Sequence, residues 1–325
     1  MPKIALVFFI AFELCYYLLI AQTGIVEYFS SNILLIAPLP IGGVLGSLLS
    51  YAIKTTAHHK IKLFLGLQLM VSFFYPQLSM ILLFILGLSV GALAPLIINE
   101  LKKANTLQMG FALAISYSVG TFLFNYEAAL RGNLAILLTC VVLIASFFLP
   151  KEEKALHLVC QNQEYSLFIM SLWVFLDSTL FESLSRDISI SIWRDGYTFE
   201  IALFHIIGVV CALYFKIEKN QKELFIVLLF ALSYLFYFVH EALILSIIYP
   251  FVISFYNVVI LQTLLKKDLK TLSVYMIFIG WIASGTGLFV ALEDFILFVP
   301  IIFLIALIKI LNTQQIQHKE KTCLN

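Results

Sequence analysis

Long hydrophobic stretches dominate this chain, and its basic residues lie only in the gaps between them. All seventeen lysines fall in every second gap, whereas the three arginines, Arg131, Arg186 and Arg194, fall in the alternate gaps. Basic loops of membrane proteins are retained on the cytoplasmic side, because positively charged segments resist translocation. The sorting therefore predicts twelve crossings of a bilayer, with both termini in the cytoplasm.

The composition supports a membrane protein. Hydrophobic residues make up 62% of the chain and charged residues only 12%, whereas a soluble domain has about 25% charged residues. The net charge is +1 and basic residues form no patch outside the short loops, so nucleic acid is not an expected partner. The five cysteines form no CxxC pair and no metal-like spacing with histidine, so we expect free thiols, no metal and no cofactor.

The lengths of the apolar stretches set the expected helices. A helix needs about 20 apolar residues to cross the hydrocarbon of a bilayer. Residues 63–98 and 224–265 are too long for one span, so each is expected to contain a hairpin, near Tyr75-Pro76-Gln77 and His240-Glu241. The expected spans are 4–21, 33–53, 61–75, 78–98, 107–125, 134–150, 166–186, 200–216, 224–239, 243–265, 272–290 and 296–311.

The longest polar connection divides these spans into six plus six. We expect an N-terminal six-helix bundle (1–150), a central cytoplasmic loop (151–165), a C-terminal six-helix bundle (166–311) and a cytoplasmic tail (312–325). The halves also echo each other, since Lys102-Lys103 recurs at Lys266-Lys267 and Glu13 recurs at Asp177, in both cases 164 residues later. A repeat after six spans keeps both copies the same way up in the membrane.

This arrangement resembles the major facilitator superfamily, whose members fold as two six-helix bundles joined by a cytoplasmic loop. The family's signature loop between the second and third helices has a glycine, an acid four residues later, and then basic and glycine positions. Here Gly46 and Lys54 keep the glycine and one basic residue, whereas Ser50 replaces the acid and Ile53 the second glycine. The resemblance implies an all-α polytopic transporter working by alternating access, and no enzyme.

Two acids lie in the middle of expected spans. Glu13 lies ten residues from Lys3, about 15 Å at 1.5 Å per residue, and Asp177 lies thirteen residues from Glu164, about 20 Å by the same rise. An ionisable group at that depth is costly and commonly marks an ion or proton path. The resemblance places both on helices that line the central cavity and implies proton coupling. The alternative is an acid satisfied by a neighbouring hydroxyl or a buried water, with no transport role.

Further candidates follow from their positions near these acids or on the expected cavity helices. Tyr16 and Tyr17 share the face of Glu13 and are expected to hydrogen-bond it. His205 is a candidate proton relay, because histidine titrates near neutrality, although a structural role is the alternative. The expected proton-coupling residues are Glu13, Asp177 and His205, and the expected substrate-binding residues are Tyr16, Tyr17, Ser178, Tyr256, Asn257 and Trp281.

Small residues at four-residue spacing predict close contacts between helices, because association in lipid depends on close backbone approach. Four spans carry such stripes, and the resemblance implies that the second helix packs on the eleventh and the fifth on the eighth. The stripes are Gly42, Gly46 and Ser50; Ala112, Ser116 and Gly120; Gly208 and Ala212; Ala283 and Gly287.

No lysine or arginine is expected near the midplane, which disfavours phosphates and dicarboxylates, since a buried unpaired anion is costly. The sequence thus predicts a monomeric, proton-coupled carrier of a small cationic, amphipathic or neutral solute, surrounded by lipid in a bacterial inner (plasma) membrane. Three other readings stay open: a non-transporting sensor or assembly factor of the same fold, an intramembrane transferase, and a ten-helix drug/metabolite exporter. The lysine pattern opposes the last, and no paired-acid or nucleophile motif supports the transferase.

Overall fold

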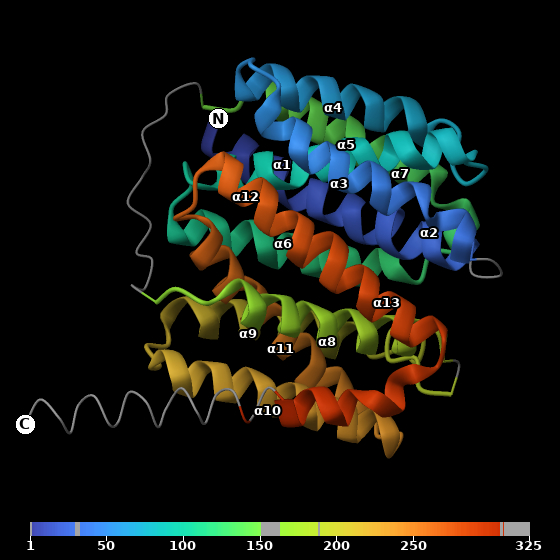
Figure 1. Cartoon of the computed structure of the whole chain (residues 1–325), viewed down its shortest axis with the longest axis vertical. Helices are drawn as coiled ribbons and strands as arrows, with labels where there is room; N and C mark the ends of the chain where they lie inside the picture. The colour runs from blue at the N-terminus through green and yellow to red at the C-terminus, as the bar shows by residue number, and fades with distance from the viewer. Residues whose placement is uncertain (1, 30–32, 151–162, 188, 306–307, 309–325) are drawn as a thin grey trace, which may run out of the picture. The chain divides into compact units, whose positions relative to one another are not determined.

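The computed structural model describes residues 2–29, 33–150, 163–187, 189–305 and 308, and every regular element in these ranges is a helix (Figure 1). The structure therefore confirms the all-α class. The expected central loop lies mostly, and the expected C-terminal tail wholly, outside the described residues.

The first half of the chain contains seven α-helices. The first span is continuous from α1 through a π-helix, η1, into α2. The elements are α1 (Pro2–Tyr16), η1 (Tyr17–Gln22), α2 (Thr23–Tyr28), the 3₁₀ helix η2 (Ile33–Ile36), α3 (Pro38–Ala52), α4 (Ala57–Ser72), α5 (Met80–Leu101), α6 (Thr106–Phe124), the 3₁₀ helix η3 (Ala128–Leu130) and α7 (Gly132–Phe147).

The second half repeats this pattern, with a second π-helix, η4, inside its fifth span. Helical residues 299–305 follow the last 3₁₀ turn. The elements are α8 (Leu167–Arg186), α9 (Thr198–Tyr214), α10 (Lys219–Phe238), α11 (Ala242–Leu264), α12 (Leu269–Met276), η4 (Ile277–Ala283), α13 (Ser284–Leu292) and η5 (Phe295–Phe298).

Each of the first eleven expected spans corresponds to a helical segment, and within the described ranges eight of these are long and apolar enough to cross a membrane. Both expected hairpins are confirmed: α4 ends at Ser72 before α5 begins at Met80, and α10 ends at Phe238 before α11 begins at Ala242. His240 takes a left-handed φ of 58° in the second turn. The twelfth span is described only through 305 and at 308, so the count of twelve is partly confirmed.

Short polar side chains fix where several helices begin. The Asn105 side chain accepts from the backbone N–H of Gln108, whose side chain in turn accepts from the Asn105 N–H, both at 2.8 Å. This capping box satisfies two N–H groups that a helix leaves without partners. Ser79 and Ser166 cap α5 and α8 in the simpler one-bond form. The loops that separate the spans therefore also carry the helix-start signals.

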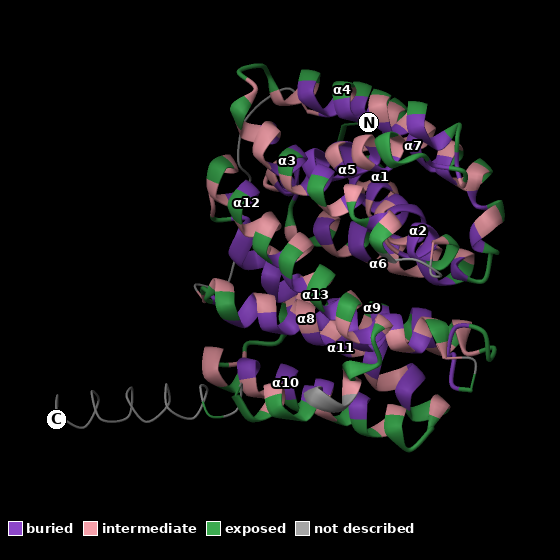
Figure 2. Cartoon of the chain, turned by 45° about the vertical axis from the view of Figure 1, so that its right-hand side comes forward, coloured by how far each residue is buried: buried purple, intermediate pink, exposed green. Residues whose placement is uncertain are grey.

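The chain forms two compact units, each considered by itself below. Unit 1 comprises residues 1–160 and 261–281, and unit 2 comprises residues 161–260 and 282–325. Buried and exposed residues alternate along the helices of each unit, which gives each helix a packed face and an open face (Figure 2).

Close backbone contact between α3 and α5 is the tightest packing in unit 1. A Cβ placed on Gly42 or Gly46 would lie 2.1 Å from a carbonyl oxygen of α5, and one on Gly91 would lie 2.1 Å from the Gly43 carbonyl. Only glycine allows this approach. Gly42 and Gly46 of the predicted stripe thus pack on α5, whereas its third residue, Ser50, contacts the eleventh span.

The eleventh span does contact α3, through neighbouring residues. The hydroxyls of Ser50 and Ser273 lie 2.7 Å apart, and the Trp281 ring covers Gly43. Ser50 occupies the position where the resembled family carries an acid. Here it contacts the eleventh span through a hydrogen bond between two neutral hydroxyls.

Lysines close the loop end of unit 1. Lys60 donates to the Ser50 carbonyl at 2.7 Å, and Lys102 donates to the Lys267 carbonyl at 2.7 Å. Lys103 donates to the buried Glu100 carboxylate at 2.8 Å and to the Pro150 carbonyl at 3.3 Å. Carbonyls at helix C-termini lack intrahelical donors, and cations stabilise them. Three lysine-bearing loops thus meet at one end of the unit, as their predicted common side requires.

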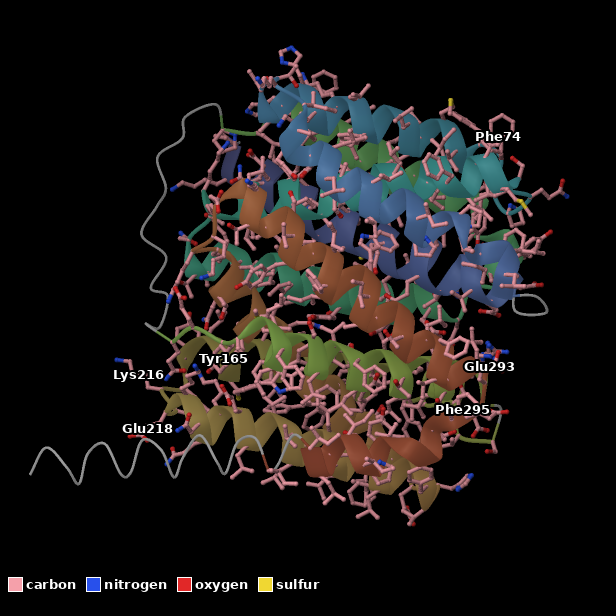
Figure 3. All side chains as sticks on the ribbon, in the orientation of Figure 1. Phe74, Tyr165, Lys216, Glu218, Glu293 and Phe295 are labelled. Atoms are coloured by element: carbon pink, nitrogen blue, oxygen red, sulfur yellow. The ribbon has the colours of Figure 1, made fainter. Side chains whose placement is uncertain are left out.

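In unit 2, Gly208 and Gly287 allow close helix contacts within the unit. A Cβ on Gly208 of α9 would lie 2.5 Å from the Phe251 carbonyl of α11, and one on Gly287 of α13 would lie 2.7 Å from the Phe175 carbonyl of α8. Lys216 and Glu218 lie at one end of this unit, and Glu293 and Phe295 lie at the other (Figure 3).

Candidate functional site

Asp177 lies midway along α8 and is held by two tyrosines of α11. The Tyr249 hydroxyl donates to Asp177 Oδ1 at 2.8 Å, and the Tyr256 hydroxyl donates to Oδ2 at 2.5 Å. Both tyrosines are fully buried, whereas Asp177 itself keeps partial exposure. Asp177 forms no ion pair with any described residue. The two tyrosines hold both oxygens of the Asp177 carboxylate in place. Because the side chain is partly exposed, an additional cation or proton can still reach it.

Aromatic rings surround the two phenols. The Trp193 ring lies 6.3 Å from that of Tyr249, and the Phe230 ring lies 5.4 Å from that of Tyr256. Trp193 belongs to the 187–199 connection, in which Ile190, Ile192 and Trp193 are buried. Because large aromatic side chains pack rigidly, these contacts hold the two hydroxyls in position to donate to the Asp177 carboxylate.

Ser178 and Asn257, two predicted substrate contacts, neighbour this cluster in the sequence but differ in their surroundings. The Ser178 hydroxyl donates to the Ser284 carbonyl of α13 at 2.8 Å, so it joins two helices. Asn257 follows Tyr256 on α11, is partly exposed, and makes no hydrogen bond from its side chain within the described part of the chain. Asn257 is therefore the more available of the two for a solute.

His205 lies apart from the Asp177 cluster, on the contact between α9 and α11. Its Nδ1 lies 2.6 Å from the Ser254 hydroxyl, and its side chain is buried. Gly208, one turn later, is the point where α9 approaches α11 most closely. These contacts tie His205 to helix packing.

Glu13 lies inside unit 1, in a hydrogen-bonded group with α4 and α7. The Gln68 amide nitrogen donates to Glu13 Oε2 at 3.1 Å and to the Thr139 hydroxyl at 3.3 Å. Thr139 uses its own hydrogen on the Ala135 carbonyl at 2.8 Å, so it accepts from Gln68. These two acceptors fix the orientation of the Gln68 amide. Its Oε1 is buried without a donor among the described residues.

The tyrosines predicted to bond Glu13 are placed differently. The Tyr16 hydroxyl lies 3.0 Å from the Ser72 hydroxyl, whose hydrogen goes to the Gln68 carbonyl. Tyr16 therefore donates to Ser72, and the expected bond from Tyr16 to Glu13 is not formed. Tyr17 is partly exposed at the start of η1. Trp281, another predicted substrate-binding residue, packs on Gly43.

Arg131 lies in a turn between helices, as predicted, but its burial and its partners were not predicted from the sequence. It is 1% exposed, and its guanidinium donates to the Leu19 and Phe124 carbonyls at 2.9 and 2.7 Å and to the Thr23 hydroxyl at 2.9 Å. Leu19 belongs to the π-helix η1, where widened turns leave carbonyls poorly paired. Arg131 thus completes the hydrogen bonding of this irregular turn.

Tyr249 and Gln68 were also missed as partners of the two acids, and Thr139 was missed as a partner of Gln68. For Tyr249 a signal exists, because it precedes Tyr256 by two helical turns and shares its face. Gln68 and Thr139 are single polar residues in apolar spans, a signal that the sequence reading did not use. Among the described residues no group of three or more His, Cys, Asp or Glu side chains is placed to hold a metal ion.

No protein-family model and no curated protein matches the sequence. Three solved structures share its architecture. A proton:xylose symporter, XylE, aligns over 96% of this chain and 95% of its own length, with a TM-score of 0.63 and 15% identity. The human organic anion transporter MFSD10 aligns over 90% and 92%, with a TM-score of 0.58 and 14% identity.

The transporter FucP, in an outward conformation, aligns over 90% of each chain with a TM-score of 0.56 and 12% identity. XylE and FucP are described as major facilitator superfamily proteins. This chain therefore has a major facilitator superfamily-like fold, as its sequence pattern suggested.

Proposed function

We propose that this chain is a secondary active transporter of a small cationic, amphipathic or neutral solute, coupled to protons and working by alternating access. The observation that carries the proposal is Asp177: a partly exposed carboxylate midway along a membrane helix, held by two phenols and without an ion pair among the described residues. A charge at that depth costs several kcal/mol. A protein keeps such a group when it binds a cation or a proton there.

The three structural neighbours support transport over the other readings. XylE is named a proton:xylose symporter and MFSD10 an organic anion transporter. We favour a solute that is not an anion, because Asp177 offers an acceptor pair and neither lysine nor arginine contacts it. Asn257, Tyr256 and Ser178 are the proposed solute contacts in unit 2, and Tyr16, Tyr17 and Trp281 those in unit 1.

Glu13 and His205 have smaller parts in the proposal. Glu13 is satisfied by Gln68 and fully enclosed, so we propose that it exchanges protons only when unit 1 opens around it. His205 is proposed as a relay between α9 and α11. We further propose a monomer of two six-helix bundles (1–150 and 166–311) in a bacterial inner membrane, with both termini cytoplasmic.

The test is solute flux in proteoliposomes with an imposed pH gradient, using a pool of amines, sugars and amino acids read by mass spectrometry. Wild type is compared with Asp177→Asn and Glu13→Gln, and with Asp195→Asn as a matched exposed control. We expect gradient-driven flux in wild type and the control, and its loss in Asp177→Asn. Unchanged flux in Asp177→Asn contradicts the coupling, and no flux of any solute by folded wild type contradicts transport.

A further inference from the structure

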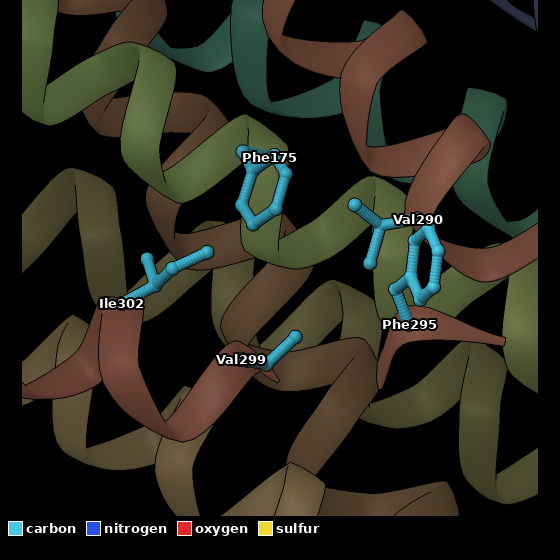
Figure 4. Close-up of a pocket in the computed structure, with 5 residues that line it drawn as sticks. All are labelled: Phe175, Val290, Phe295, Val299 and Ile302. Atoms are coloured by element: carbon cyan, nitrogen blue, oxygen red, sulfur yellow. The ribbon is translucent and has the colours of Figure 1, made fainter. Parts of the chain in front are cut away.

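A second site lies in unit 2, at the end that carries the 293–295 turn. Side chains from α8, α13, η5 and the helical residues after it surround a cavity of about 360 Å³, here called the α8–α13 cavity (Figure 4). All of its lining side chains among the described residues are apolar: Phe175, Val290, Phe295, Val299 and Ile302. Protein interiors contain few voids larger than a water molecule, and an apolar cavity of this size stays dry and accepts an apolar ligand.

The helical residues 299–305 form one side of this cavity. Val299 is fully buried and lines the cavity, as does the partly exposed Ile302. The opposite stripe of the same helix is open: Ile301, Leu304, Ile305 and Ile308 are 52–59% exposed. Phe295, 46% exposed, stands at the edge of the cavity. Phe295 thus leaves an apolar opening at the edge of the cavity through which an alkyl chain can enter.

Two acids stand beside this edge. Glu293 and Asp294 immediately precede Phe295, both are exposed, and neither forms a salt bridge with a described residue. Asp294, which follows α13 and precedes η5, takes the left-handed conformation, with φ of 56°. Two negative charges at the edge of a wholly apolar cavity complement a ligand that has a hydrocarbon chain and a cationic head. They disfavour anionic lipids by the same charge.

We propose that the α8–α13 cavity binds a single-chain amphiphile with a cationic head, its chain among the five apolar side chains and its head beside Glu293 and Asp294. This goes beyond the proposed transport site. Phe175 lines the cavity while Asp177, two residues on, points to a different face of α8. The two sites can therefore be tested separately.

The probe is dodecyltrimethylammonium, measured by equilibrium binding to the full-length protein in phosphatidylcholine nanodiscs, with empty nanodiscs as background. Ile302→Phe fills the cavity, and Ile301→Phe, its neighbour on the exposed stripe, is the matched control. We expect Ile302→Phe to weaken binding at least about tenfold, because several methylenes lose burial worth about 0.8 kcal/mol each. Ile301→Phe should bind as wild type does.

The charge requirement is tested with Glu293→Gln/Asp294→Asn, which keeps the shape and suits the left-handed position. Each exposed ion pair contributes about 0.2–1 kcal/mol, so we expect binding weakened by about threefold or more. Dodecanol, the uncharged comparator, should be unaffected by this change. Equal binding by the charge variant overturns the cationic head, and equal binding by a folded Ile302→Phe overturns the cavity. If Ile302→Phe does not fold, Ile302→Ala is used instead, and the alkyl chain length that binds best is compared with that of wild type. The same preferred chain length in both proteins overturns the cavity.

The same measurement on Asp177→Asn separates this proposal from the transport proposal. We expect Asp177→Asn to bind the probe like wild type even where flux is lost. Loss of binding in Asp177→Asn assigns the probe to the Asp177 cluster and overturns the α8–α13 site.

Discussion

The guanidinium of Arg131 donates to the backbone carbonyl of Leu19 at 2.9 Å, joining positions 112 residues apart in the sequence. This bond ties the start of α7 to the π-helix inside the first span. The irregular turn is therefore held from outside its own helix, and the residue that holds it comes from a loop that sequence reading treats as solvent.

Arg131→Gln should lower stability substantially. Hydrogen bonds from a charged group contribute about 1.5–3 kcal/mol each, and the carbonyls left behind are buried. We expect a loss of at least about 2–3 kcal/mol, seen as a lower midpoint of thermal unfolding in detergent. Arg186→Gln, an exposed arginine at the end of α8, is the control and should leave the midpoint in place. Equal midpoints for both variants contradict a structural role for Arg131.

Two glycines of unit 1 should respond to alanine in opposite directions. A methyl group at Gly91 meets the Gly43 carbonyl, whereas one at Gly66 of α4 meets nothing within 4 Å. Gly91→Ala should cost about 1–3 kcal/mol from overpacking. Gly66→Ala should gain up to about 1 kcal/mol from helix propensity. Unfolding midpoints of the two variants in one detergent check both signs, and a neutral Gly91→Ala contradicts the tight contact of α3 with α5.

Glu13 and Gln68 should behave as a coupled pair. Gln68→Met removes the described donor to a buried carboxyl group and should cost about 1–3 kcal/mol. Adding Glu13→Leu removes the group left without a partner, so the double variant should be more stable than Gln68→Met alone. Unfolding midpoints of wild type, of each single variant and of the double variant, compared with one another, make up a double-mutant cycle. Additive losses contradict the pairing.

The folded double variant then answers a separate question about Glu13. Flux that persists in it assigns Glu13 to structure, and lost flux in a stable variant assigns it to proton exchange.

His205→Asn tests the relay against helix packing. Because His205 meets Ser254 where α9 and α11 approach closely, we expect a lower unfolding midpoint in either case. A relay predicts in addition a changed dependence of flux on pH. Ser254→Ala, which removes the partner and keeps the imidazole, is the control. A lower midpoint with an unchanged pH profile contradicts the relay.

Helix positions followed from the sequence because a bilayer imposes length and polarity on every span. The turns near Pro76 and His240 were predictable for the same reason, since 63–98 and 224–265 exceed one crossing. The depth of Glu13 and Asp177 followed from counting residues, and both lie within helices as expected.

The partners of these groups did not follow from the sequence. The acceptors of Arg131 are largely backbone carbonyls, which every residue carries and no pattern marks. A stripe such as Gly42 and Gly46 can pack on any helix that approaches closely, so the sequence did not identify α5 as its neighbour. Tyr249 was the exception, because its position two turns before Tyr256 marked a common face that the sequence reading passed over.

We expect the lysines at the loop end of unit 1 to act both during membrane insertion and in the folded protein. We expect the charge of Lys102 to help keep its loop on one side of the membrane during insertion. In the folded structure the same ammonium donates to the Lys267 carbonyl. A single charge-removing mutant therefore confuses biogenesis with stability. Lys102→Arg preserves the insertion signal while changing the geometry of the bond, so comparing it with Lys102→Gln separates how the chain enters the membrane from how it holds together once there.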